Sequence, residues 1–163
     1  MNIKTNQGFT LLEALLGFLI LSIGMLGIAS LQAISLKAGQ TSIYGSAAMM
    51  KVDELFESMR ANPTALDSYN GTGPGINNNC AASACDAAML AQEDVFLWIA
   101  NLNAGLPDSV TSEVVVVAAA VPSKMSTVTI NVTWSERNKD KSGPASVSKT
   151  YTTTTSICAE IPC

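Results

Sequence analysis

A single carboxylate, Glu13, stands at the start of a run of 23 residues without charge, Ala14 to Leu36. An ionised side chain inside a membrane is costly, at roughly 2.5–3.5 kcal/mol for a central position even on lenient insertion scales. Glu13 therefore needs a cationic partner, and the next ionisable residue along the chain is Lys37. We expect the partner to lie on another chain, so that the chemistry of Glu13 is charge pairing between subunits.

Catalytic chemistry has little support in the composition. The chain contains no histidine, which removes the commonest general base and most catalytic zinc sites. Glu93 and Asp94 are adjacent, but neighbouring residues of a helix point in different directions, so we expect them on a solvated face. We predict that the protein is not an enzyme and that it holds no metal and no cofactor.

Four cysteines form two C-x4-C pairs, Cys80 with Cys85 and Cys158 with Cys163. An even number of cysteines outside the apolar run suggests disulfides in an oxidising compartment such as the periplasm. Local pairing closes small loops, whereas a crossed pairing would stabilise the fold more in the loop-entropy model. We favour local pairing because each pair falls in a loop-like segment, and the crossed pairing stays open.

The uncharged run is long enough to cross a membrane, since 23 residues at 1.5 Å span about 35 Å against a hydrocarbon core of about 30 Å. A secretory signal is disfavoured because only Lys4 is basic before the run, and the run is too long. A core helix of a soluble domain is disfavoured by the same length. An ordinary single-pass anchor leaves Glu13 and the short leader Met1–Gly8 unexplained.

The segment GFTLLE, residues 8–13, resembles the class III signal of type IV prepilins. The resemblance implies that a prepilin peptidase cuts after Gly8, that Phe9 is then N-methylated, and that Glu13 is the family's glutamate at the fifth mature position. Cleavage would create an ammonium group on Phe9, about one helical turn before Glu13. In a stack of staggered helices, the carboxylate of one subunit can meet the ammonium of its neighbour, and the two charges offset one another.

Two further stretches, LSIGMLGIASLQ (Leu21 to Gln32) and MRANP (Met59 to Pro63), resemble PilV-type minor pilins. The resemblance implies a low-copy subunit of a type IV pilus that acts in assembly initiation and the tip complex, and so in piliation, adhesion and twitching motility. The implied partners are other minor pilins, the major pilin, the prepilin peptidase, the inner-membrane assembly platform and a tip adhesin. The implied location is the inner membrane with a periplasmic head, and afterwards the pilus tip.

Two alternatives remain. A minor pseudopilin of a type II secretion system shares the GFTLLE motif, and a membrane-anchored periplasmic binding module would need neither cleavage after Gly8 nor a role for Glu13. The formal net charge of −4 argues against a nucleic-acid partner. Many major pilins have a proline where this chain has Ser30, and here Gly24 and Gly27 are the weak points of the helix. Local melting on assembly and close helix packing would each explain these glycines.

We expect three parts: a leader (1–8), a membrane and filament-core half of a long helix (9–36), and a periplasmic head (37–163). The helix should run from Phe9 to Ala61 and end at Asn62-Pro63, because the residue before proline is pushed out of helical geometry. Its second half carries an apolar stripe that should lie on a sheet. The stripe consists of Tyr44, Ala48, Val52, Leu55, Phe56 and Met59.

The head should begin with a surface loop, Pro63 to Asn79, in which Asn70-Gly71-Thr72 forms a turn. A second helix capped by Asp86 should run to about Ala104. We expect its buried face to consist of Met89, Phe96, Ile99 and Leu102, with Trp98 near the edge.

Three strands should follow: Glu113–Val121, stopped by Pro122; Thr127–Trp134; and Ser146–Ile157, after a charged turn at Glu136–Pro144. The middle strand alternates cleanly between apolar and polar residues, as in a half-buried antiparallel strand. The third has Val147, Tyr151 and Ile157 in phase. The sequence thus predicts an α+β, type IV pilin-like fold with a long N-terminal helix packed on a small antiparallel sheet.

Overall fold

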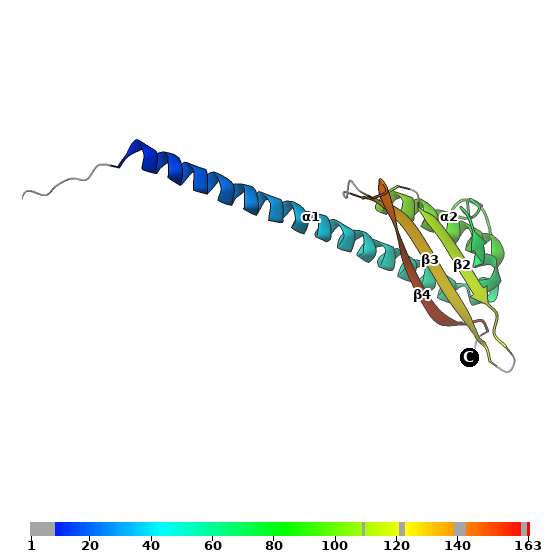
Figure 1. Cartoon of the computed structure of the whole chain (residues 1–163). Helices are drawn as coiled ribbons and strands as arrows, with labels where there is room; N and C mark the ends of the chain where they lie inside the picture. The colour runs from blue at the N-terminus through cyan, green and yellow to red at the C-terminus, as the bar shows by residue number, and fades with distance from the viewer. Residues whose placement is uncertain (1–8, 109, 121–122, 139–142, 161–162) are drawn as a thin grey trace, which may run out of the picture. The chain divides into compact units, whose positions relative to one another are not determined.

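The computed structural model describes residues 9–108, 110–120, 123–138, 143–160 and 163. The chain divides into two compact units, Met1–Gln40 and Thr41–Cys163, which we call the N-terminal unit and the head. Helix α1, Leu11–Ala61, contributes to both. The predicted α+β class, a long N-terminal helix with a small antiparallel sheet, is confirmed (Figure 1).

Helix α1 ends at Ala61, as predicted from Asn62-Pro63, but it begins at Leu11 and not at Phe9. The later start has a local cause at Thr10. The Thr10 carbonyl oxygen accepts hydrogen bonds from the backbone nitrogens of Glu13 (3.1 Å) and Ala14 (3.2 Å), and Thr10 Oγ1 accepts from the same Glu13 nitrogen at 3.3 Å. Thr10 is therefore the N-cap of α1.

Between α1 and α2 the structure corrects the expected loop. Pro63–Tyr69 forms the 3-10 helix η1, and Gly71–Thr72 forms the short strand β1, so the predicted turn at Asn70-Gly71-Thr72 is wrong. The reason is tertiary: Gly71 pairs with Val114 and Thr72 with Glu113, and the Asn70 side chain accepts a hydrogen bond from the Val116 nitrogen at 2.9 Å.

Helix α2 spans Ala87–Gly105 and is capped by Asp86, whose side chain accepts a 2.8 Å hydrogen bond from the Met89 nitrogen. Its predicted position and the predicted burial of Leu102 are confirmed, but the rest of its predicted buried face is wrong. The apolar residues buried on α2 are Ala91, Val95, Trp98 and Leu102. Met89, Phe96 and Ile99 are half-buried. The helix is turned so that Trp98 faces α1, where its indole nitrogen donates to the Lys51 carbonyl at 2.7 Å.

The sheet consists of β1, β2 (Thr111–Val117), β3 (Met125–Arg137) and β4 (Ser146–Cys158), antiparallel throughout and in the order β1-β2-β3-β4. Strand β2 ends before the predicted Val121. It loses its ladder partner there, because its last pair is Val117 with Thr127, and the Ala119 nitrogen donates to the Ser126 hydroxyl at 3.2 Å. Pro122 and residues 139–142 of the predicted charged turn lie outside the described residues.

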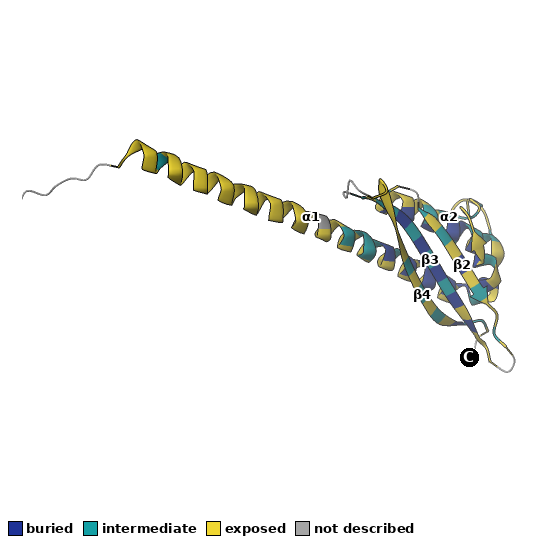
Figure 2. Ribbon diagram, viewed as in Figure 1, coloured by how far each residue is buried: buried dark blue, intermediate teal, exposed yellow. Residues whose placement is uncertain are grey.

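One face of the sheet carries the core (Figure 2). The alternation predicted for β3 is confirmed, since Val128, Ile130, Val132 and Trp134 are at most 4% exposed. The second half of α1 and α2 pack on this face. The predicted stripe on α1 is confirmed by the burial of Ala48, Val52, Leu55, Phe56 and Met59, with Tyr44 half-buried. On β4, Ile157 is buried, Tyr151 is half-buried, and Val147 is exposed.

Candidate functional site

Glu13 lies in the first turn of α1, three residues after the Thr10 cap. A carboxylate in this position is favoured by the helix macrodipole. Thr10-x-x-Glu13 also has the spacing of a capping box, a helix-start signal in the sequence that the resemblance to prepilins does not use. The cap orients the backbone that carries Glu13, whose side chain is exposed within the single chain. Glu13 is thus available to a partner outside the chain.

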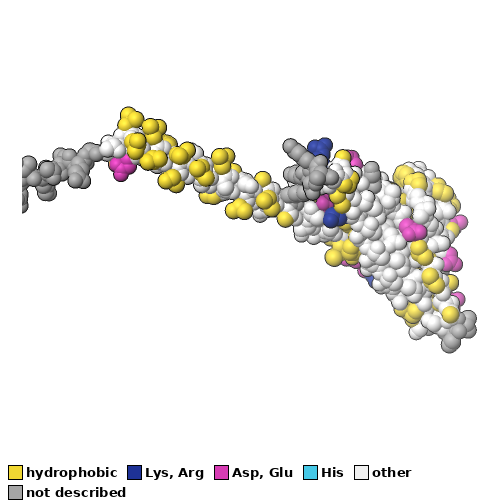
Figure 3. Space-filling model, viewed as in Figure 1, with side chains coloured by type: hydrophobic (Ala, Val, Ile, Leu, Met, Phe, Trp, Pro, Cys, Tyr) yellow, Lys and Arg dark blue, Asp and Glu magenta, His cyan; other side chains and the backbone are white. Residues whose placement is uncertain are grey.

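After Glu13 and as far as Leu36, the helix exposes its large apolar side chains, and Figure 3 shows them along one face of it. They occur at positions all around the helix. From Phe9 to Leu36 the large hydrophobic side chains are between 51% and 80% exposed. These side chains belong to Phe9, Leu11, Leu12, Leu15, Leu16, Phe18, Leu19, Ile20, Leu21, Ile23, Met25, Leu26, Ile28, Leu31, Ile34 and Leu36. A helix that is hydrophobic all round is normally buried in lipid or among other helices. Among the described residues, α1 is the one helix long and apolar enough to cross a membrane.

The residues predicted for processing fall at the edge of the described chain. The predicted leader Met1–Gly8, with Gly8 on one side of the predicted cut, lies outside the described residues. Phe9, the residue predicted to become the new N-terminus, is described and is 77% exposed. It stands two residues before the start of α1, next to the Thr10 cap.

The cysteines lie in the head, joined as two local disulfides. Cys80 pairs with Cys85 across a Cα–Cα distance of 5.4 Å, and Cys158 pairs with Cys163 across 5.9 Å. The second pair ties the last residue of the chain to the end of β4. Cys163 Sγ also lies 3.5 Å from Met125 Sδ, at the start of β3.

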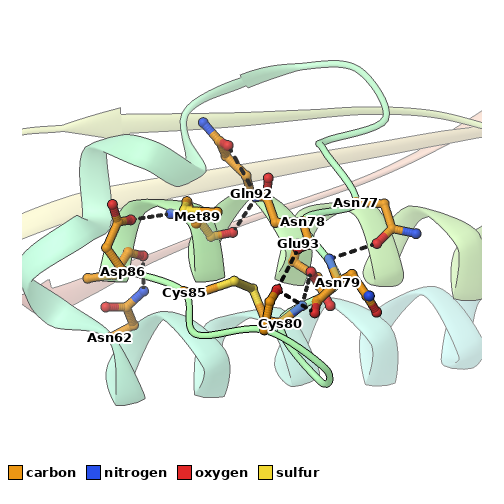
Figure 4. Close-up of a disulfide and its surroundings, with 12 residues drawn as sticks. Asn62, Asn77, Asn78, Asn79, Cys80, Cys85, Asp86, Met89, Gln92 and Glu93 are labelled. Carbon is orange, nitrogen blue, oxygen red and sulfur yellow. Dashed lines mark hydrogen bonds between the residues drawn. A yellow bond between two sulfur atoms is a disulfide. The ribbon is translucent and has the colours of Figure 1, made fainter.

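The loop closed by Cys80 and Cys85 is held against α2 by polar contacts (Figure 4). The Cys80 backbone nitrogen donates to Glu93 Oε2 at 2.9 Å, and Asn78 Nδ2 donates to the Met89 carbonyl at 2.8 Å. Glu93 is only 8% exposed, so the prediction of a solvated face is wrong for this residue. The reason lies in the loop, which covers Glu93 and gives its carboxylate a donor.

The same contacts bring three potential metal ligands together. The sulfur atoms of Cys80 and Cys85 and a carboxylate oxygen of Glu93 lie within 4.8 Å of one another. Both sulfurs are joined in the disulfide, and a disulfide sulfur has no thiolate to offer a metal. The cluster therefore acts as a structural clamp on the loop.

Asp94, the neighbour of Glu93, is also engaged within the head. The Tyr69 hydroxyl donates to Asp94 Oδ2 at 2.7 Å. Burial raises the pKa of Tyr69 well above its usual value, and the hydrogen bond to Asp94 adds to the rise. Glu93 and Asp94 thus fasten two different segments to α2, a loop and η1, which places both in the scaffold of the head.

Comparison with known proteins adds one match. Residues 3–29 match the family model described as the prokaryotic N-terminal methylation motif. No curated protein and no solved structure matches the chain. The match covers GFTLLE and most of the apolar run, and its part from residue 11 to residue 29 lies in α1. The motif indicates a type IV pilin or pseudopilin, a structural subunit whose apolar N-terminal helix fits anchoring in a membrane before assembly.

Proposed function

We propose that the protein is a minor pilin of a type IV pilus and that it acts in the initiation of pilus assembly at the tip. The observation that carries the proposal is the combination at the N-terminus: GFTLLE, a matched methylation motif, and a helix that exposes apolar side chains on all sides. Such a surface is stable only in lipid or against other apolar helices. A pilin helix occupies both environments in turn.

In this proposal the prepilin peptidase cuts after Gly8, and Phe9 is N-methylated. The protein first sits in the inner membrane with its head in the periplasm, and the assembly platform then moves it into the filament. There neighbouring helices replace the acyl chains around the apolar side chains of α1. The two local disulfides suit a head that folds in an oxidising compartment.

In this proposal Glu13 acts when the helix moves from the membrane into the filament. The carboxylate stands in the first turn of α1, and the amine created on Phe9 would stand just before that turn. In staggered neighbouring subunits, the carboxylate of one chain and the ammonium of the next can pair. Each charge alone would be costly among apolar helices, and the pair removes most of that cost. The Thr10 cap supports this role because it holds the turn that carries Glu13.

The choice of a PilV-type pilin over a pseudopilin rests on LSIGMLGIASLQ and MRANP. MRANP also contributes to the structure of the head. Met59 is fully buried, and the Asn62 side chain donates to the Ala87 carbonyl at 2.8 Å, which joins the end of α1 to the start of α2. Other minor pilins, the major pilin and a tip adhesin are the partners that this role requires.

The first experiment replaces Glu13 by Gln, which keeps the size of the side chain and removes its charge. We expect the variant to insert into the membrane and to be cleaved as the wild type, but to be depleted in sheared pili and to reduce piliation. Glu57→Gln is the matched control, because Glu57 is an exposed acidic residue on the same helix and forms an ion pair with Arg60 within its own chain. Wild-type incorporation of Glu13→Gln would refute the pairing role.

The second experiment reads the mature N-terminus by mass spectrometry. We expect a chain that begins with methylated Phe9, and an uncut precursor for Gly8→Val. An intact Met1 in wild-type cells would refute the prepilin assignment and favour the membrane-anchored binding module. Deletion of the gene distinguishes the minor pilin from the pseudopilin. Loss of pili and twitching supports the minor pilin, and loss of exoprotein secretion with normal pili supports the pseudopilin.

A further inference from the structure

Glu136, near the end of β3, accepts hydrogen bonds from two side chains of the head. Thr41 Oγ1, on α1, donates to Glu136 Oε2 at 2.9 Å. Trp134 Nε1, on the same strand as Glu136, donates to Glu136 Oε1 at 2.9 Å. One carboxylate therefore links the first residue of the head to the sheet, using both of its oxygens.

The sheet side of this link is rigid. Trp134 is 4% exposed and packs in the core, so its indole holds the Glu136 carboxylate from a fixed position. Hydrogen bonds to a charged group are about twice as strong as bonds between neutral groups. Glu136 is half-buried, and its carboxylate is partly shielded from water.

On the helix side of the link, packing against the core is sparse. The first fully buried residue of α1 is Ala48, seven residues after Thr41, and before it Tyr44 and Ala47 are half-buried and pack against the core. Gly39 and Gly45 flank the contact, and a glycine inside a helix costs about 1 kcal/mol relative to alanine. The boundary between the two compact units falls between Gln40 and Thr41, directly before the linked residue.

We infer that Glu136 is a latch that sets the point at which α1 becomes attached to the head. With the latch closed, the attachment begins at Thr41. With the latch open, Thr41 loses its bond to the sheet, and about two turns of the helix, residues 41–47, are held more weakly, through the half-buried Tyr44 and Ala47. The inference depends only on contacts within the head and stands whether the protein is a minor pilin, a pseudopilin or a binding module.

The test is hydrogen exchange, read by mass spectrometry, on the full chain in detergent micelles. Thr41→Val removes the hydroxyl while keeping the shape of the side chain, and Glu136→Ala removes both acceptor oxygens. Glutamine is not used at position 136, because its amide group could donate to Thr41 Oγ1 and keep the link. In both variants we expect the amides of residues 41–47 to exchange about tenfold faster, as the loss of a hydrogen bond to a charged group predicts. The amides of residues 52–59, which carry the buried Val52, Leu55 and Met59, should keep their rates.

Thr133→Val is the matched control. Its hydroxyl lies 2.9 Å from that of Thr150 on the same sheet, away from α1, so its loss should leave residues 41–47 unchanged. Wild-type exchange of residues 41–47 in both latch variants would overturn the inference. So would equal acceleration in Thr133→Val, or acceleration that extends equally to residues 52–59, since Glu136 would then stabilise the head as a whole.

Discussion

Residues 11–36 and 44–61 belong to the same helix, yet they meet their surroundings in opposite ways. In the first stretch apolar side chains cover every side of the helix, and all the large ones are more than half exposed. In the second they form a stripe whose members, from Ala48 to Met59, are at most 4% exposed against the sheet and α2. The contrast shows that the apolar side chains of the second stretch are buried within their own chain, while those of the first need lipid or other helices.

The two stretches should therefore respond differently to the same change. A substitution in the head and its counterpart in the N-terminal unit test this difference, and burial in the core gives the strongest contrast. All are measured on the full chain in detergent, with head unfolding followed by the fluorescence of Trp98 and Trp134.

Leu55→Ala should lower the free energy of unfolding of the head by about 2–5 kcal/mol, because it opens a cavity at a residue that is 1% exposed. Leu26→Ala removes the same atoms from a residue that is 71% exposed and should leave head unfolding unchanged. Urea titration of both variants measures the difference. If both variants lowered the free energy of unfolding of the head equally, the stability of the head would depend on the N-terminal stretch as well.

Gly75→Ala should destabilise the head by about 1–3 kcal/mol. Gly75 has φ +67°, and an added Cβ would lie 2.5 Å from the Phe96 nitrogen and 2.6 Å from the Gln92 carbonyl oxygen on α2. Gly24→Ala should instead stabilise its helix. Nothing lies within 4 Å of the added Cβ, and alanine favours a helix by about 1 kcal/mol relative to glycine. Urea titration checks the first variant, and slower amide exchange around residue 24 checks the second.

The two helix caps provide a third comparison. Asp86→Ala removes the cap of α2 and should cost the head about 1 kcal/mol in urea titration. Thr10→Ala removes the cap of α1 and should instead speed exchange of the Glu13 amide about fivefold, which corresponds to the same free energy. Head unfolding should not change in Thr10→Ala, and a loss there would contradict the separation of the two units.

The smallest effect concerns pH and is confined to the head. The pKa of Tyr69 is raised, by burial first and then by Asp94, so the folded state keeps its proton when an unfolded tyrosine, with a pKa of about 10, has lost it. Its contribution to stability is fully present below pH 10 and declines as the pH rises above that value. The stability difference between wild type and Tyr69→Phe should shrink above pH 10, and a constant difference would refute this.

Local signals made much of the fold predictable. Asn62-Pro63 stops α1, Asp86 caps α2, and the strict alternation from Val128 to Trp134 identifies a half-buried strand. Each of these features depends on backbone geometry or on periodicity within a few residues. The N-terminal motif is predictable for the same reason, since it consists of six contiguous residues, 8–13.

The predictions that the structure contradicts share a different cause. Trp98 was expected at the edge of α2 and is in the core, because a carbonyl of α1, 47 residues away in the chain, accepts its indole hydrogen bond. Glu93 was expected in solvent and is covered by the loop that Cys80 and Cys85 close. Strand β1 was expected to be a turn and exists because β2 lies beside it. Each outcome depends on a partner far away in sequence.

Contiguous residues are enough to establish that the N-terminal helix needs an apolar environment and that Glu13 stands at its start, because charge, hydropathy and helical spacing are local properties. They also establish where the main helices and strands lie. Which side of α2 is buried, how Glu93 and Asp94 hold the loop and η1, and that Glu136 contacts Thr41 depend on the tertiary structure. Those features follow from packing, which brings distant segments within the few ångströms over which hydrogen bonds and van der Waals contacts act.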